Sequence, residues 1–221
     1  MTSHNVVTHV DDPELVDRRR RQIVTAATTL FSERGFFKTT IKDIAKLADI
    51  SPGLVYLYVK EKEDVLLLVL LEVVDAYAQE IPVAIEGLTD PLERLTRAVE
   101  AYCRVVDRHR SATVLAYRST KSLTPDRRSL IQDKEVATNA LISEVILQCI
   151  EAGYLRRVNV DVLTYQLVLA AHGWALKGWY FKSRLTLDSY IVDNLDCILG
   201  GVLTDAGKEC YRTLCAGPAG A

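Results

Sequence analysis

The sequence predicts an all-α protein, and three observations support that fold class. Hydrophobic residues recur at spacings of three and four along most of the chain, as they do on one face of a helix. No segment shows the alternation of apolar and polar residues that is typical of a half-buried strand. Glycine or proline stands where several of the periodic segments end, as at Gly35, Pro82 and Gly153. We therefore expect roughly nine helices.

Length and composition are those of a globular protein. The chain has 221 residues, of which 49% are hydrophobic and 25% charged, and a chain of this size can bury a substantial core. Its longest apolar run, residues 65–71, is much shorter than the ~20 residues that span a bilayer. The acidic N-terminal segment is unlike a signal peptide. We expect a cytoplasmic protein with no membrane partner.

The reactive side chains predict neither an enzyme nor a metal site. The five cysteines are odd in number and scattered, with no Cys-x-x-Cys spacing that would suggest zinc or a disulfide framework. The four histidines are isolated from one another, and no Ser/His/Asp set, acidic pair or glycine-rich phosphate loop stands out. We therefore expect no catalytic residues, no cofactor and no metal.

The N-terminal part of the chain predicts a flexible arm followed by an amphipathic helix. The arm covers residues 1–17, which lack periodicity for most of their length. The helix is expected over residues 17–34 and is closed by Gly35, because the left-handed position after a helix prefers glycine. Its buried stripe consists of Ile23, Ala26, Ala27, Leu30 and Phe31.

Residues 39–62 predict two short helices joined by a tight turn. Thr39 or Thr40 can cap the first helix, because a threonine hydroxyl accepts a bond from an unpaired backbone N–H. Ser51 can cap the second helix, and Pro52 suits its first position, where no N–H is needed. This arrangement is a helix-turn-helix, whose second helix can lie in the major groove of DNA. An ordinary helical hairpin is the alternative for so short a pattern.

Local charge favours the DNA-binding interpretation. Residues 18–62 contain ten Lys or Arg and four Asp or Glu, although the whole chain has a net charge of −2. Phosphate binding depends on local rather than global positive charge. The basic run of residues 18–21 either contacts the DNA backbone or minor groove, or is simply solvated.

Residues 40–63 carry a characteristic series of residue types. The series is Thr40, Ile44–Ala45, Ala48, Ile50–Ser51, Gly53, Tyr56, Tyr58 and Lys62–Glu63. Preceded by an amphipathic helix, this series resembles the DNA-binding domain of the TetR/AcrR family of one-component transcriptional repressors. The resemblance covers about residues 20–71; beyond them only the all-helical plan is similar. The departures are Asp49, where the family usually has glycine, and Val59, where it usually has an aromatic residue that packs below the recognition helix.

The resemblance implies that Thr40, Tyr56 and Lys62 contact DNA phosphates. We add Ser51, Tyr58 and Lys42 as further phosphate contacts, although either tyrosine could instead pack in the small core. The exposed start of the second helix offers Pro52, Gly53, Leu54 and Leu57 to the bases, and none of these side chains can form a bidentate bond to a base edge. We therefore expect shape and phosphate geometry to carry much of the specificity.

The rest of the chain is expected to be helical as well. We expect a broadly apolar connector over residues 62–81, ending before Pro82, and later helices over residues 91–109, 112–122, 124–151, 161–182 and 187–203. The predicted domains are a DNA-binding domain (18–62), an effector-binding and dimerisation domain (63–215) and a disordered tail (216–221).

Two faces of the last long helices are candidate functional surfaces. As the family dimerises through its last helices, we assign a homodimer interface to one face, although ordinary core is the alternative. That face consists of Leu167, Ala171, Trp174, Gly178, Leu195, Ile198, Leu199 and Val202. The opposite face carries His172, and we expect an effector pocket lined by Tyr102, Tyr117, Arg118, Asn139 and His172.

The sequence therefore predicts a homodimeric repressor that a small-molecule effector releases from a palindromic double-stranded operator. Arg127 and Arg128 near a pocket mouth would suit an acyl-CoA or another acidic, hydrophobic effector. The alternative is a protein-interaction module derived from a helix-turn-helix that no longer binds DNA.

Overall fold

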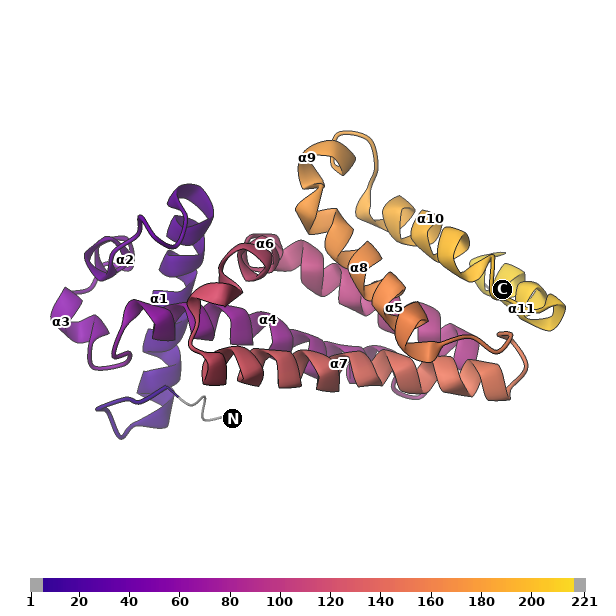
Figure 1. The fold of residues 1–221 in the computed structure, drawn as a ribbon, viewed down its shortest axis with the longest axis horizontal. Coiled ribbons are helices and arrows are strands. Elements are labelled where there is room, and N and C mark those ends of the chain that lie inside the picture. The colour runs from indigo at the N-terminus through magenta and orange to yellow at the C-terminus, as the bar shows by residue number, and fades with distance from the viewer. Residues whose placement is uncertain (1–5, 217–221) are drawn as a thin grey trace, which may run out of the picture. The chain divides into compact units, whose positions relative to one another are not determined.

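The computed structural model describes residues 6–216, and its helical elements confirm the predicted fold class. The described residues form no strand, and a single isolated antiparallel bridge joins Leu155 to Leu203. In chain order the elements (Figure 1) are α1 Pro13–Arg34, α2 Ile41–Leu47, α3 Pro52–Val55, α4 Lys62–Ile85, α5 Pro91–Arg108, α6 Arg110–Ser119, the 3-10 turn η1 Thr120–Ser122, α7 Pro125–Glu151, α8 Val160–Leu176, α9 Gly178–Phe181, α10 Leu187–Leu199 and α11 Asp205–Ala216.

The chain divides into two compact units. The first unit contains Met1–Val73 and Ser111–Gln132, and the second contains Val74–Arg110 and Asp133–Ala221. This division differs from the boundary expected at residue 62, because the segment from α6 to the start of α7 packs with the N-terminal helices. Two continuous helices, α4 and α7, therefore begin in the first unit and end in the second.

The core of the first unit forms around α1. All five residues of its predicted stripe are buried, which confirms the amphipathic assignment. The helix starts earlier than expected, at Pro13, because the Asp12 carboxylate caps it by accepting bonds from the N–H groups of Glu14 (3.0 Å) and Leu15 (3.2 Å).

The segment before α1 is not a free arm over its described part. Val6 is buried, and the Leu57 carbonyl accepts bonds from the backbone N–H of His9 (2.9 Å) and the hydroxyl of Thr8 (3.1 Å). The prediction of a flexible arm is therefore wrong for residues 6–17, because these hydrogen bonds to Leu57, just after α3, hold the segment in place. The rest of the predicted arm and most of the predicted tail (residues 217–221) lie outside the described residues.

The helix-turn-helix is closed by side-chain caps. The Thr40 hydroxyl accepts a bond from the Asp43 N–H (3.2 Å), and the Asp43 carboxylate accepts one from the Thr40 N–H (2.9 Å), which forms a capping box. Thr39 is not the cap; it is buried and donates to the carbonyls of Leu30 and Gly35. At the start of α3 the Ser51 hydroxyl accepts from the Leu54 N–H at 3.1 Å, as predicted.

Helix boundaries differ from expectation at three places. α4 runs through Pro82 to Ile85. Proline has no backbone N–H, but Pro82 lies in an exposed last turn, where water can bind the carbonyl that lacks a helical donor. The helix expected over residues 161–182 breaks at Lys177, beside the weak helix former Gly178, into α8 and α9. Residues 205–216 form α11, and a Cβ on Gly207 would lie 2.1 Å from the Tyr154 carbonyl oxygen, so only glycine permits that approach.

The second unit packs α8 between α5 and α10 (Figure 1) around a small polar cluster. The rings of Tyr77 on α4 and Tyr102 on α5 stack with centroids 4.0 Å apart. Their hydroxyls lie 3.5 Å and 3.1 Å from Nε2 of His172 on α8. Burial lowers the pKa of His172 from 6.5 to about 4, so the imidazole is neutral at pH 7. Within residues 6–216, no helix combines the length and apolar character needed to cross a membrane.

Replacing Asp49 should change stability with a sign that depends on the new residue. Asp49 has φ = 53°, a left-handed conformation that glycine adopts without steric cost. We expect Asp49→Gly to raise the free energy of unfolding by about 0.5 kcal/mol and Asp49→Ala to lower it by about 1 kcal/mol. Urea denaturation at fixed protein concentration measures both, and equal effects of the same sign would contradict the assignment.

His172 should make the protein less stable in mild acid. Its folded pKa lies below its unfolded pKa, so its contribution is complete above pH 6.5 and is lost as the pH falls from 6.5 to about 4. We expect the free energy of unfolding to fall within that window by up to about 1.4 kcal/mol per pH unit more in the wild type than in His172→Gln. Denaturant titrations at several pH values test this, and parallel acid limbs would exclude it.

Candidate functional site

Most of the predicted DNA-binding residues share the exposed surface of α2 and α3. Tyr56 and Leu57 are 49% and 41% exposed, although both are large and Leu57 is apolar. The other exposed members of the predicted set are Thr40, Lys42, Ser51, Pro52 and Gly53. The two side-chain caps fix the backbone of this surface. At the start of α2 the Asp43 carboxylate accepts bonds from both the N–H (2.9 Å) and the hydroxyl (2.6 Å) of Thr40.

Tyr58 is corrected from a phosphate contact to a core residue. Its side chain is only 2% exposed, and the neighbouring Val59 is 1% exposed. Both side chains are therefore buried beneath α3, although position 59 has valine and not an aromatic residue. Periodicity could not separate the two tyrosines, because α3 has only four residues and the chain leaves helical geometry between them.

Lys62 binds the protein backbone in this structure. Its ammonium donates to the carbonyls of Phe36 (2.9 Å), Phe37 (3.4 Å) and Thr39 (3.0 Å), and Nζ lies 4.4 Å from the centroid of the Phe36 ring. An ammonium has three N–H groups, and these three carbonyls can occupy all of them. Lys62 therefore fixes the loop that leads to Thr40. We expected its ammonium to be available to a DNA phosphate, but in this structure it binds carbonyls instead.

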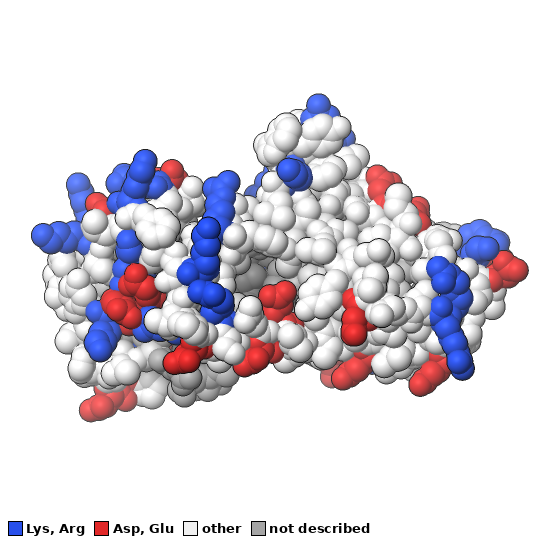
Figure 2. Space-filling model, viewed as in Figure 1, with Lys and Arg blue, Asp and Glu red and all other residues white. Residues whose placement is uncertain are grey.

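The basic run at the start of α1 contains one arginine that binds backbone carbonyls and two that are exposed. The Arg20 guanidinium donates to the carbonyls of Val6 (2.6 Å) and Tyr58 (3.2 Å), so it joins the N-terminal segment to the end of the helix-turn-helix. Burial lowers the pKa of Arg20, and the carboxylates of Asp17 and Asp64 oppose that effect. Arg18 and Arg21 remain exposed. On the face shown in Figure 2, lysine and arginine side chains gather over α1–α3 and over the region of α6.

The five predicted effector-pocket residues are not all brought together. Tyr102 and His172 bind each other in the polar cluster of the second unit, and Asn139 is buried in that unit at 3% exposure. Tyr117 and Arg118 are exposed on α6 and belong to the first unit, so their assignment to the same pocket has no support. Sequence reasoning missed Tyr77, because α4 is apolar around most of its circumference and gave no sign of which side would face a histidine.

Asn139 has an unusual environment for a buried amide. Neither its Nδ2 nor its Oδ1 has a hydrogen-bond partner among the described residues. One turn further along α7, the Ser143 hydroxyl lies 3.0 Å from that of Thr164 on α8, which places this part of α7 against α8. A buried polar group without a partner is costly and commonly marks a place where water or a ligand binds.

Arg127 and Arg128 do not form an anion site. The Arg127 guanidinium pairs with Glu61 and Asp64, and the Arg128 guanidinium donates to the carbonyls of Lys121 (3.1 Å) and Leu123 (3.2 Å). The argument for an acidic effector from these two arginines is therefore wrong, because both side chains serve intramolecular contacts.

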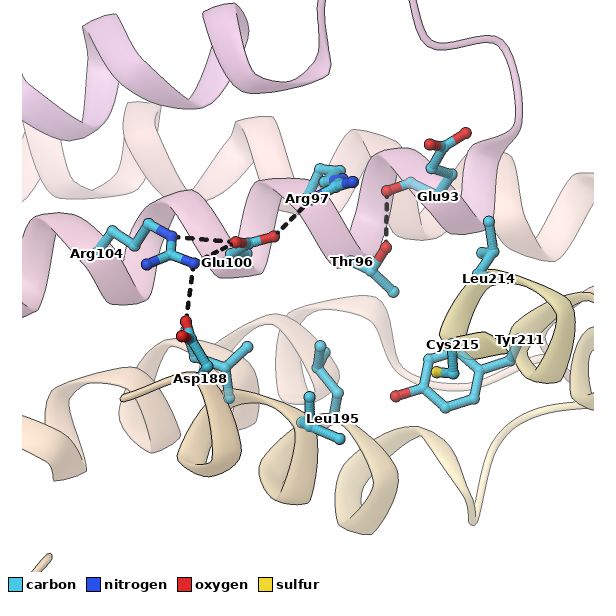
Figure 3. Close-up of a pocket in the computed structure, with 12 residues that line it drawn as sticks. Glu93, Thr96, Arg97, Glu100, Arg104, Asp188, Leu195, Tyr211, Leu214 and Cys215 are labelled. Carbon is cyan, nitrogen blue, oxygen red and sulfur yellow. Dashed lines mark hydrogen bonds and ion pairs between the residues drawn. The ribbon is translucent and has the colours of Figure 1, made fainter. Parts of the chain in front are cut away.

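A cavity of about 340 Å³ lies elsewhere in the second unit, among α5, α10 and α11 (Figure 3). Four of its charged side chains pair with one another, since Glu100 pairs with Arg97 (3.0 Å) and Arg104 (2.7 Å), and Arg104 also pairs with Asp188 (2.9 Å). None of the predicted effector residues lines it.

The face predicted for dimerisation is core in this chain. Leu167, Ala171, Trp174, Leu195 and Leu199 are at most 5% exposed, and the Trp174 indole N–H donates to Asp107 at 2.7 Å. Gly178, Ile198 and Val202 are half-buried. The exposed apolar residues lie on other sides of these helices, with Val162 at 55%, Tyr165 at 41% and Leu169 at 53% on α8 and Val192 at 48% on α10.

Comparisons with known proteins agree with both halves of the fold. The family described as bacterial regulatory proteins, tetR family, matches residues 23–69, and the family described as tetracyclin repressor-like, C-terminal domain, matches residues 88–183. The solved structure of the ketosteroid transcriptional regulator KstR2 of Mycobacterium tuberculosis is 25% identical with a TM-score of 0.72, over 91% of this chain and 100% of that one.

Two further proteins extend the comparison. AibR, solved in complex with isovaleryl coenzyme A and operator DNA, shares the fold at a TM-score of 0.71 and 19% identity, over 81% of this chain and 97% of that one. The HTH-type transcriptional regulator HbdR of Aromatoleum sp. (strain CIB) is 52% identical over 207 residues, which cover 94% of this chain and 90% of that protein. The predicted resemblance and the expectation of a regulator rather than an enzyme are thereby confirmed, and the chain belongs to the TetR family of transcriptional regulators.

Proposed function

We propose that this TetR-family regulator is a homodimeric repressor that binds a palindromic operator and is released by a small-molecule effector. The observation that supports it most is the capped, exposed α2–α3 surface, which presents Thr40, Tyr56 and Lys42 together beside a helix N-terminus. A single helix-turn-helix reads few base pairs, so two copies on a palindrome give useful specificity.

We place the effector in the second unit, near Tyr102, His172 and Asn139. The unpartnered amide of Asn139 supports this placement, since a ligand could bind the donor and the acceptor that the protein leaves unused. Because His172 is neutral at pH 7, the buried end of the ligand should be an uncharged hydrogen-bonding group. An acyl-CoA fits this description through its thioester, and AibR, which has the same fold, was solved with isovaleryl coenzyme A.

Operator binding by the α2–α3 surface is testable with two substitutions. The operator is first selected from random duplex DNA with the wild-type protein. We expect Tyr56→Phe to weaken binding by roughly 3- to 10-fold through loss of one hydrogen bond, and Lys42→Ala to reduce the slope of log K against log salt by about one. Tyr117→Phe, which alters an exposed tyrosine on α6, is the control and should bind as the wild type does.

The same binding experiment also distinguishes a DNA-binding repressor from a protein-interaction module. A protein-interaction module without DNA binding would show no salt-dependent affinity for any duplex, whereas a DNA reader shows a steep slope. Normal binding by both α2–α3 variants would place the DNA contact elsewhere.

The exposed apolar residues of α8 and α10 are the proposed dimer surface. Val162, Tyr165 and Leu169 lie on α8 at spacings of three and four residues, so they share one face, and Val192 on the neighbouring α10 is also exposed. Apolar surface of this kind, on helices that pair in the family, is typical of an interface between subunits.

A charge on this surface should separate the subunits. We expect Leu169→Glu to be monomeric in sedimentation experiments at concentrations where the wild type is dimeric, because the carboxylate would be desolvated at the interface. Val136→Glu, at an exposed valine on α7, is the matched control and should stay dimeric. A dimeric Leu169→Glu protein would exclude this surface.

A further inference from the structure

Arg127 joins the first turn of α7 to the first turn of α4. Its Nη1 lies 2.7 Å from the Glu61 carboxylate, and its Nη2 binds the Asp64 carboxylate. The Arg127 side chain is 21% exposed and that of Asp64 only 3%. All three residues belong to the first unit, although Arg127 lies 66 positions after Glu61 and 63 after Asp64 in the sequence. A carboxylate so well buried needs a partner, because a buried charge without one is strongly destabilising.

Asp64 also binds the backbone that leads into α4, of which it is the third residue. Its Oδ2 accepts bonds from the backbone N–H groups of Lys60 (2.8 Å) and Glu61 (3.0 Å), while its other oxygen binds Arg127. The same carboxylate therefore fixes the entry into α4 and joins it to α7. Replacing Arg127 leaves this carboxylate without its counter-ion, so the first turn of α4 should become less well defined.

Lys62 lies in that turn and holds the loop before α2. Its ammonium binds the carbonyls of Phe36, Phe37 and Thr39, and the next residue is Thr40, whose hydroxyl and N–H form the start of α2. The first turn of α4 thus joins two sets of contacts, those of Asp64 with Arg127 and those of Lys62 with the loop before α2.

We propose that Arg127 is a positioning residue for DNA binding. It keeps the first turn of α4, and hence Lys62 and the loop of residues 36–40, in the geometry that presents Thr40 to a phosphate. Arg127 itself touches no phosphate, because its guanidinium is occupied by two carboxylates. α7 continues from Arg127 into the second unit and contains Asn139, so the backbone of one helix connects Asn139 to the ion pair of Arg127. This role rests on the proposed contact of Thr40 with DNA.

The test compares Arg127→Gln with Lys121→Ala, which removes a positive charge from an exposed side chain in η1 of the same unit. We expect Arg127→Gln to bind the selected operator about tenfold more weakly than the wild type and Lys121→Ala to bind equally well. Amide hydrogen exchange at residues 40–43 should be faster in Arg127→Gln alone. The salt slope on a non-specific duplex of equal length should be unchanged, since Arg127 binds no phosphate and Thr40 carries no charge.

Glu61→Gln provides a milder variant in case Arg127→Gln does not fold. It keeps the Arg127–Asp64 pair, so we expect a smaller loss of operator affinity and a smaller change in exchange at the same amides. The proposal is overturned if both folded variants bind the operator like the wild type, if Lys121→Ala loses as much affinity, or if Arg127→Gln lowers the salt slope by about one, which would indicate a direct phosphate contact. Failure of the wild type to bind any duplex would instead refute the proposed function.

Discussion

The geometry of the DNA-binding surface depends on how Lys62 is held. Its ammonium binds three backbone carbonyls in the loop between α1 and α2, and these carbonyls have no helical N–H to accept from. In turn, the backbone just before the helix that carries Lys62 is bound by a buried carboxylate, Asp64, with an arginine from α7 as its counter-ion. The buried Phe36 ring packs against Phe31, and directional bonds from charged groups fix the carbonyls of the same loop.

The polar groups in the second unit have a different character. Tyr77, Tyr102 and His172 bind one another where burial keeps the imidazole neutral, and Asn139 retains both a donor and an acceptor without a protein partner. These buried groups are neutral, whereas the first unit contains the Arg127–Asp64 ion pair. For the effector site proposed beside Tyr102, His172 and Asn139, we therefore expect a ligand with an uncharged buried end.

The last long helices illustrate why a helical pattern leaves a question open. The residues of α8 assigned to the dimer, such as Leu167 and Trp174, are core, and so is His172, which was assigned to the opposite face, whereas Tyr165 and Leu169 are exposed. Both faces are apolar enough to be buried, so the spacing cannot tell which face packs against α5 and α10 and which is left for a partner. That choice follows from the packing of the neighbouring helices.

The sequence by itself determined the all-α fold, the stripe of α1, the cap at Ser51, and the family, because these depend on local periodicity, on a hydroxyl at a helix start and on a short ordered motif. For the cap of α2 it left Thr39 and Thr40 as alternatives, and the structure decided for Thr40. The tertiary structure decided that Tyr58 and Arg20 face inward, that Lys62 binds carbonyls, and that the segment before α1 is held in place. It also decided that Arg127 pairs with Glu61 and Asp64. The partners of Lys62 and Arg127 all lie more than twenty residues away in the chain, and no local pattern records which distant carbonyl or carboxylate a flexible cationic side chain will reach.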